Sequence, residues 1–136
     1  MAFDRRFVIT SIPLWKDSNW GTGSTNNSDP IDMRDIAAQG KCSLSYRLAG
    51  SGGAATAGTV AFTYQVSNVG PGGIAGTGWI TPGGKSGTEG TIGTTLVATN
   101  DAKVFEFTPV LAPWMRIRGM VGTSAPVVMS AELNVV

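Results

Sequence analysis

Residues 114–121, Trp-Met-Arg-Ile-Arg-Gly-Met-Val, and residues 126–136, Pro-Val-Val-Met-Ser-Ala-Glu-Leu-Asn-Val-Val, alternate between two sides of an extended chain. One side of the first stretch carries Met115, Ile117, Gly119 and Val121. One side of the second carries Val127, Met129, Ala131, Leu133 and Val135. A period of two is typical of a strand that buries one face. The turn residues between the two stretches predict a terminal antiparallel hairpin.

The same alternation recurs upstream in two stretches. Residues 41–48 would bury Cys42, Leu44, Tyr46 and Leu48. Residues 59–67 would bury Val60, Phe62, Tyr64 and Val66. Because the Gly- and Ala-rich loop between them has no secondary-structure pattern of its own, the two strands are predicted to pair as a hairpin. Further strands are expected at 91–99 and 103–108, the latter with Phe105 and Phe107, or Val104, facing inward.

The N-terminal region has a weaker pattern. Phe7, Ile9 and Ile12 predict a first strand that ends at Pro13, because a proline cannot donate a hydrogen bond to a strand ladder. Residues 20–30 have the composition of a loop. Residues 28–40 suit either a short strand or a helix of two turns, with Asp29 as N-cap, Pro30 at the first helical position and Gly40 past its end. We favour a strand or turn that runs into a short helical bend.

These patterns predict an all-β fold. About seven or eight strands, with turn signals roughly every 8 to 12 residues and almost no helical periodicity, indicate an antiparallel β-sandwich or jelly roll with long Gly-rich loops. The 136 residues suit a single domain. Within it we expect an N-terminal strand or arm and loop over residues 1–27, and the β-sandwich domain over residues 28–136.

Charge and cysteine content exclude several classes of partner and site. Ten Lys and Arg against nine Asp and Glu leave a net charge of +1, with no basic run that would attract nucleic acid or a charged membrane surface. Charged residues are 14% of the chain, against about 25% in an average domain, which gives weak protection against self-association. Cys42 is the one cysteine, so we expect no internal disulfide and a buried thiol. Neither a secretory signal nor a membrane span is recognisable, and we expect folding in a cytoplasm.

The sequence offers little for catalysis. It contains no histidine, so a Ser-His-Asp or Cys-His arrangement within one chain is excluded. The carboxylates of Asp29, Asp32 and Asp35 are the one catalytic candidate, because glycosidases need only two carboxylates. Helix capping and a salt bridge to Arg34 are the favoured interpretation of this triplet. The Gly-rich stretches lack a phosphate-loop ending, and the triplet lacks the calcium-loop pattern. We therefore expect a protein that is not an enzyme, with no cofactor and no metal.

Tryptophan and arginine side chains are the candidates for contacts with other molecules. An indole in or beside a loop can stack on a sugar ring or fill a neighbouring subunit, or it can close the edge of the core. Two arginines that project from one strand face can bind partner carboxylates bidentately, or they can remain a solvated face. The predicted interface residues are Trp15, Trp20, Trp79, Trp114, Arg116 and Arg118.

Three segments together carry a resemblance: residues 28–36, residues 62–67 and residues 109–118, which include Pro113-Trp-Met-Arg-Ile117. With these segments, the chain over residues 28–136 resembles small β-rich structural proteins of tailed-bacteriophage virions, which decorate heads or belong to fibres and tails. The resemblance implies a virion location after assembly in the bacterial cytoplasm, and no enzymatic activity. It also implies homo-oligomers or symmetric placement on a shell. We favour a trimer, and we expect contacts with the major capsid protein or other virion proteins.

The sequence thus supports one function and leaves alternatives open. The favoured function is a capsid decoration or stabilising protein that binds the assembled shell through subunit contacts, with residues 1–19 as an arm that reaches a neighbour. The alternatives are a tail or fibre component, or a carbohydrate-binding β-sandwich module with exposed tryptophans. A host glycan is therefore a possible partner of this protein.

Overall fold

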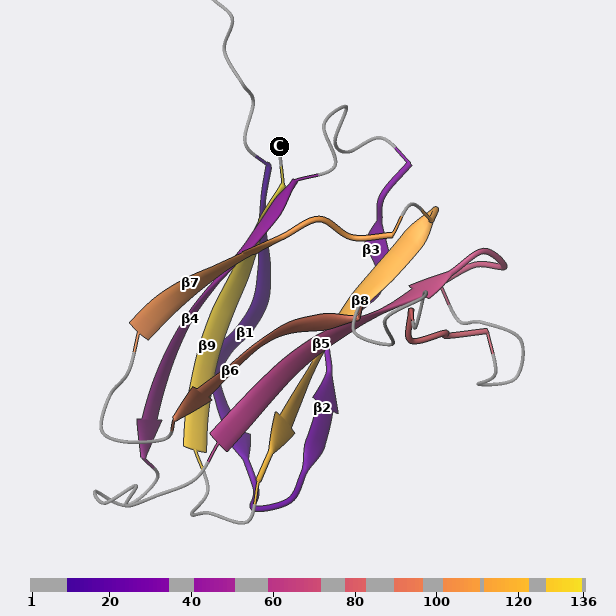
Figure 1. The fold of residues 1–136 in the computed structure, drawn as a ribbon. Coiled ribbons are helices and arrows are strands. Elements are labelled where there is room, and N and C mark those ends of the chain that lie inside the picture. The colour runs from indigo at the N-terminus through magenta and orange to yellow at the C-terminus, as the bar shows by residue number, and fades with distance from the viewer. Residues whose placement is uncertain are drawn as a thin grey trace, which may run out of the picture.

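The computed structural model describes residues 10–34, 41–50, 59–71, 78–82, 90–96, 102–110, 112–122 and 127–135. These residues form two antiparallel sheets that face each other, which confirms the predicted all-β sandwich (Figure 1). The four-stranded sheet has the order β1-β9-β4-β7, and these strands span Thr10–Trp20, Val127–Val135, Cys42–Gly50 and Ala102–Phe107. The five-stranded sheet has the order β2-β8-β5-β6, with β3 beside β8. These strands span Thr25–Asn27, Trp114–Val121, Thr59–Ser67, Thr91–Leu96 and Ile31–Asp32.

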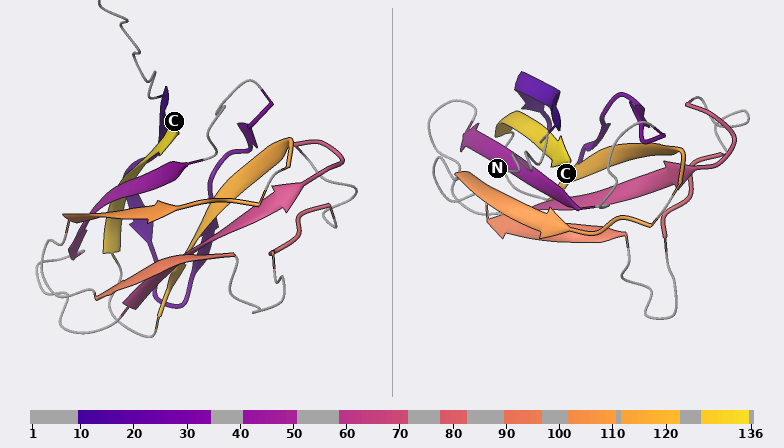
Figure 2. Two further views of the ribbon diagram at one scale, coloured as in Figure 1. Left: turned by 45° about the horizontal axis from the view of Figure 1, so that its top comes forward. Right: turned by 90° about the horizontal axis from the view of Figure 1, so that it is seen from above.

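The core lies between the two sheets, which Figure 2 shows from two further directions. Every inward position predicted for β4, β5, β8 and β9 is buried. Along β7, Phe105 and Phe107 pack against the core, while Val104 points outward and is 59% exposed. The period-two pattern therefore predicted correctly which face of each strand is buried.

Both predicted hairpins are wrong. Strand β4 pairs with β7 and β9, whereas β5 pairs with β6 and β8 in the opposite sheet. Likewise β8 and β9, which are neighbours in the sequence, belong to different sheets. An apolar face is buried equally well against a facing sheet about 10 Å away, so alternation does not reveal which strand lies beside which.

The first strand differs from the prediction. Strand β1 runs through Pro13 to Trp20 instead of ending at Pro13. This is possible because β1 is an edge strand that pairs only with β9. On the open side of an edge strand no ladder hydrogen bond is needed, so a proline is tolerated there. The register shifts on both sides of Trp15, and Asp17 adopts a positive φ of 47°. Phe7 and Ile9 lie outside the described residues, and residues 10–27 contribute β1 and β2 to the sandwich.

The segment between β1 and β4 contains two short strands. Residues 25–27, which we expected to be loop, form β2. Ile31–Asp32 form β3, so of the two structures predicted for residues 28–40, the strand is the one found here. The predicted helical bend falls on residues 35–40, outside the described residues. Ser28 fixes the segment to β8, because its backbone N–H donates to the Ile117 carbonyl at 2.8 Å and its Oγ accepts from the Ile117 N–H at 2.9 Å.

Candidate interaction surface

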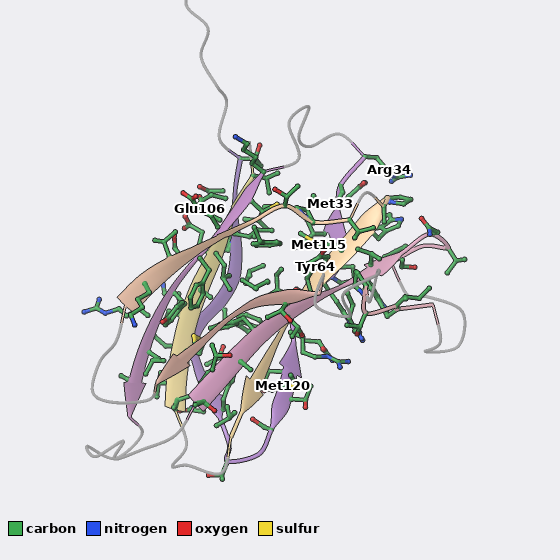
Figure 3. The ribbon with its side chains drawn as sticks, in the orientation of Figure 1. Met33, Arg34, Tyr64, Glu106, Met115 and Met120 are labelled. Carbon is green, nitrogen blue, oxygen red and sulfur yellow. The ribbon has the colours of Figure 1, made fainter. Side chains whose placement is uncertain are left out.

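The outward side of β8 carries the long side chains of four alternating residues: Trp114, Arg116, Arg118 and Met120. Each is partly buried, while the residues between them are buried in the core. In Figure 3, Met115 and Tyr64 lie between the sheets, whereas Arg34 and Met120 mark opposite ends of β8. We define the arginine face as Gln65, Trp79, Trp114, Arg116 and Arg118.

Gln65 is the centre of the arginine face. It lies opposite Arg116 in the β5–β8 ladder, so both side chains point away from the core. Its Oε1 accepts hydrogen bonds from Arg116 Nε at 2.8 Å, Arg116 Nη2 at 2.6 Å and Arg118 Nη2 at 3.1 Å. Its Nε2 donates to Thr81 Oγ1 at 3.0 Å. One neutral amide oxygen therefore serves two guanidinium groups.

The segment of residues 78–82 brings Trp79 over this cluster. Ile80 forms an antiparallel bridge with Val66, through two backbone hydrogen bonds of 2.9 Å. This position places the Trp79 ring 4.7 Å from Arg116 Cζ, in a cation–π contact. The stack and the hydrogen bonds to Gln65 fix the orientation of the Arg116 guanidinium.

The two arginines lack an acidic partner within the part of the chain that the structure describes. Arg118 Nε donates to Asn27 Oδ1 at 3.1 Å, which is again a neutral amide. Burial lowers the pKa of the Arg116 guanidinium, and the neighbouring charge of Arg118 lowers it further. The remaining N–H groups of both guanidiniums are free to bind an anion, because each guanidinium has five donors in a planar fork.

The end of β8 near β3 has a balanced charge instead. Arg34 donates to both oxygens of Asp32, at 2.9 Å from Nε and 2.7 Å from Nη2, and its Cζ lies 4.9 Å from the Trp114 ring. These hydrogen bonds lower the pKa of Asp32 to about 2. The predicted salt bridge between this aspartate and Arg34 is therefore confirmed.

The other tryptophans lie elsewhere. Trp20 is 2% exposed, and its indole meets the Trp15 ring edge-on, with 4.8 Å between ring centroids. Trp20 therefore fills the core, which is the alternative that the sequence left open, and Trp15 packs partly buried beside it. The structure thus brings Trp79, Trp114 and both predicted arginines to one sheet face, and leaves Trp15 and Trp20 away from it.

Sequence reasoning missed Gln65, Asn27 and Thr81. Gln65 stands at an outward position of a correctly predicted strand, but its meeting with Arg116 depends on β5 pairing with β8. The sequence had placed β5 beside β4. The polar residues opposite Arg116 and Arg118 become visible only once the correct strand pairing is known.

The aspartate triplet and the sheet surfaces are two other places where a site could lie. Asp29 is exposed, Asp32 is paired with Arg34, and Asp35 lies outside the described residues. Among the residues described, no three Asp, Glu or Cys side chains gather to hold a metal ion. An open hollow of about 390 Å³ lies on the four-stranded sheet, and its described lining includes Asp17, Arg47 and Ser130 but no aromatic side chain. No helix long and apolar enough to cross a bilayer occurs in the described ranges.

The fold is a β-sandwich that carries two arginines on the outer face of its five-stranded sheet. The sequence matches no protein-family model and no curated protein. The chain is similar in structure to the PBSX exported protein XepA, with a TM-score of 0.51 and 11% identity, over 93% of this chain and 36% of that one. It therefore spans about a third of that protein's length, and the likeness shows a shared fold alone.

Two further structures have lower TM-scores. The SPBc2 prophage-derived protein YomS has a TM-score of 0.46 and 15% identity, over 95% of this chain and 94% of YomS. The infectious bursal disease virus Gx strain structure has a TM-score of 0.46 and 12% identity, over 99% of this chain and 35% of that one.

Proposed function

We propose that this chain is a non-enzymatic structural protein of a bacteriophage virion, and that it decorates or stabilises the capsid through contacts between subunits. The observation that carries the proposal is the arginine face, where two guanidiniums without acidic partners in the described chain lie among tryptophans. Trp and Arg are the side chains that most often dominate the energy of protein interfaces. The resemblance of residues 28–36 and 109–118 to phage virion proteins supplies the biological setting.

The mechanism needs no chemistry beyond binding. A rigid sandwich presents a preorganised face, and burial of that face in a lattice stabilises the assembled state by mass action. Gln65 is 7% exposed and hydrogen-bonded on both sides of its amide, so it holds Arg116 and Arg118 close to one conformation before a partner arrives. Less side-chain entropy is then lost on binding.

The carbohydrate-binding alternative has less support. Carbohydrate-binding modules of this kind stack sugar rings on exposed tryptophan rings that are coplanar and lie on the same face of the domain. Here Trp20 is in the core, and Trp79 and Trp114 each have an arginine over the ring. We therefore do not propose a sugar platform.

Particles of the phage whose genome encodes the chain provide the test. We expect quantitative mass spectrometry of purified particles to find the chain in many copies per particle, in a fixed ratio to the major capsid protein. Immunogold labelling should decorate the heads, whereas labelling of tails or fibres would move the protein to that location. Absence of the chain from particles that are otherwise complete would overturn the proposed function.

A further inference from the structure

The outer face of the four-stranded sheet carries two glutamates with short side chains between them. Glu106 on β7 lies opposite Ser43 of β4, and Glu132 on β9 lies opposite Ser45 of the same strand. Both glutamates are exposed, and both point away from the core because their sequence neighbours point into it. We define the glutamate face as Glu106 and Glu132 with the serines of β4 between them.

The two carboxylates have no partner of their own. Within the described residues neither forms an ion pair or a hydrogen bond. On the other side of Glu132 stands Pro13 of β1, another side chain that cannot pair with it. Among the residues that the structure describes, the glutamate face is thus a pair of carboxylates without an ion pair, just as the arginine face is a pair of guanidiniums without one.

The two faces lie on opposite sides of the sandwich. Arg116 and Arg118 point outward from the five-stranded sheet, and the glutamates point outward from the four-stranded sheet. Figure 3 shows the labelled Glu106 and Arg34 on opposite sides of the molecule. The core between the sheets keeps these charges from meeting within one copy of the chain.

We propose that the arginine face of one copy binds the glutamate face of a second copy, with Arg116 and Arg118 paired to Glu106 and Glu132. The inference rests on the proposed function, because it takes the arginine face to be a subunit contact. A contact between two different faces is heterologous, so it generates a closed ring when the rotation between copies closes and an extended stack when it does not. Guanidinium groups bind carboxylates through two parallel hydrogen bonds, which fixes orientation as well as affinity.

The spacing of the two pairs suits this contact. Arg116 and Arg118 are two residues apart on one strand, roughly 7 Å, while the glutamates stand on strands two positions apart and are offset by two residues along β4, roughly 12 Å in all. The length of the arginine and glutamate side chains covers the difference, and the serines between the glutamates leave room for the guanidiniums. Trp79 and Trp114, beside the arginines, would cover the contact and exclude water from it.

Charge reversal tests the pairing directly. Light scattering across a wide concentration range should show that the wild-type chain self-associates. We expect Arg116→Glu/Arg118→Glu and, separately, Glu106→Arg/Glu132→Arg to weaken the association by on the order of tenfold or more. An equimolar mixture of the two variants should associate again, because each then offers the face that the other needs. A chain with all four substitutions should also self-associate.

A matched control reverses two charges that belong to neither face. Lys16→Glu/Lys103→Glu should associate as the wild type does, since Lys103 lies opposite the inward-facing Tyr46 in the β4–β7 ladder. Near-UV circular dichroism should show that each variant is folded. If a charge-reversed variant is unfolded, Arg116→Gln/Arg118→Gln is measured by light scattering in its place. We expect this neutral variant to self-associate more weakly than the wild type. A wild type that is monomeric at every concentration, or folded variants whose mixture fails to associate, would overturn the inference.

The outcomes separate this inference from the proposed function. A chain present in virions whose variants do not complement each other leaves the proposed function standing and overturns only the pairing. If the chain self-associates with the expected charge dependence but is absent from virions, the pairing of the two faces stands and the proposed function is overturned.

Discussion

At the scale of single residues, Gly119 shows how closely the core is fitted. Strand β8 passes over the indole of Trp20 at this point, and a Cβ on Gly119 would stand 2.5 Å from Cζ3 and also collide with Cη2. We expect Gly119→Ala to lower the free energy of unfolding by about 1–3 kcal/mol, because the buried Trp20 ring has to shift. Guanidinium denaturation measures the change. Gly21→Ala is the control, since a Cβ there meets nothing within 4 Å, and equal stability of the two variants would contradict the packing.

Burial controls the chemistry of Cys42. It is 3% exposed, and burial raises the pKa of its thiol to about 11. Only the thiolate reacts with alkylating agents, so at pH 8 the folded protein should react with iodoacetamide roughly a hundredfold more slowly than a free thiol. Mass spectrometry of the alkylated fraction over time measures this rate. The same protein in guanidinium should react at the free-thiol rate, and fast labelling of the folded chain would show that Cys42 is accessible.

The Asp32–Arg34 pair makes a prediction about pH. The pKa of Asp32 is lowered from 3.8 to about 2, first by the side-chain hydrogen bond from Arg34. A lowered pKa means that the pair stabilises the fold above about pH 4 and loses this contribution as the pH falls towards 2. A ¹³C NMR titration of the Asp32 carboxyl group should have its midpoint near 2 in the wild type. In Arg34→Gln the midpoint should rise towards the ordinary value, and an unchanged midpoint would rule out Arg34 as the cause.

At the scale of secondary-structure elements, β7 closes one side of the sandwich. In the right-hand view of Figure 2, β6 and β7 run beside each other where the two sheets meet. Phe105 of β7 spans this junction. Its ring stacks on the Tyr46 ring, with 5.6 Å between ring centroids. On the other side, a Cβ added to Gly93 of β6 would lie 2.7 Å from Phe105 Cε1. Because Gly93 has no side chain, the Phe105 ring of the four-stranded sheet can pack directly against the β6 backbone of the five-stranded sheet.

The junction predicts different costs for two neighbouring substitutions on β7. Phe105→Ala should lower the free energy of unfolding by about 2 kcal/mol or more, since it removes a ring packed between the sheets. Val104→Ala, at an outward position that is 59% exposed, should change it by less than about 0.5 kcal/mol. Urea denaturation of both variants measures the difference, and equal costs would mean that β7 does not contribute to the core in this way.

The elements also show what the sequence could and could not predict. The buried faces of β4, β5, β8 and β9 followed from alternation, because each strand is long enough for the period to be clear. The pairing of these strands did not follow, because both predicted hairpins rested on closeness in the sequence, and an apolar face says nothing about its neighbour. The site was half predictable for the same reason: Arg116 and Arg118 share an outward face by spacing alone, but Gln65 joins them only through the β5–β8 pairing.

At the scale of the whole molecule, the fold depends on contacts between residues that are far apart in the sequence. Strand β1 pairs with β9 from Thr10 opposite Val135 to Trp20 opposite Val127. Strand β9 also pairs along its whole length with β4, so the last strand of the chain is a central strand of its sheet. The four-stranded sheet therefore cannot form until the C-terminal residues are available, and we expect folding in milliseconds to seconds, as is typical of β-sandwiches.

The central place of β9 predicts that the strand can be supplied separately. A chain that ends at residue 122 lacks β9 and should have no near-UV circular dichroism signal, because β1 and β4 lose their shared partner. A synthetic peptide of residues 127–135 should restore the signal, since a strand added in trans can make the same ladder bonds and fill the same core positions. A peptide with Met129→Asp and Leu133→Asp is the control; both side chains are fully buried in the native sheet, so it should not restore folding. A native signal from the shortened chain alone would show that the five-stranded sheet and the rest of the core are stable without β9.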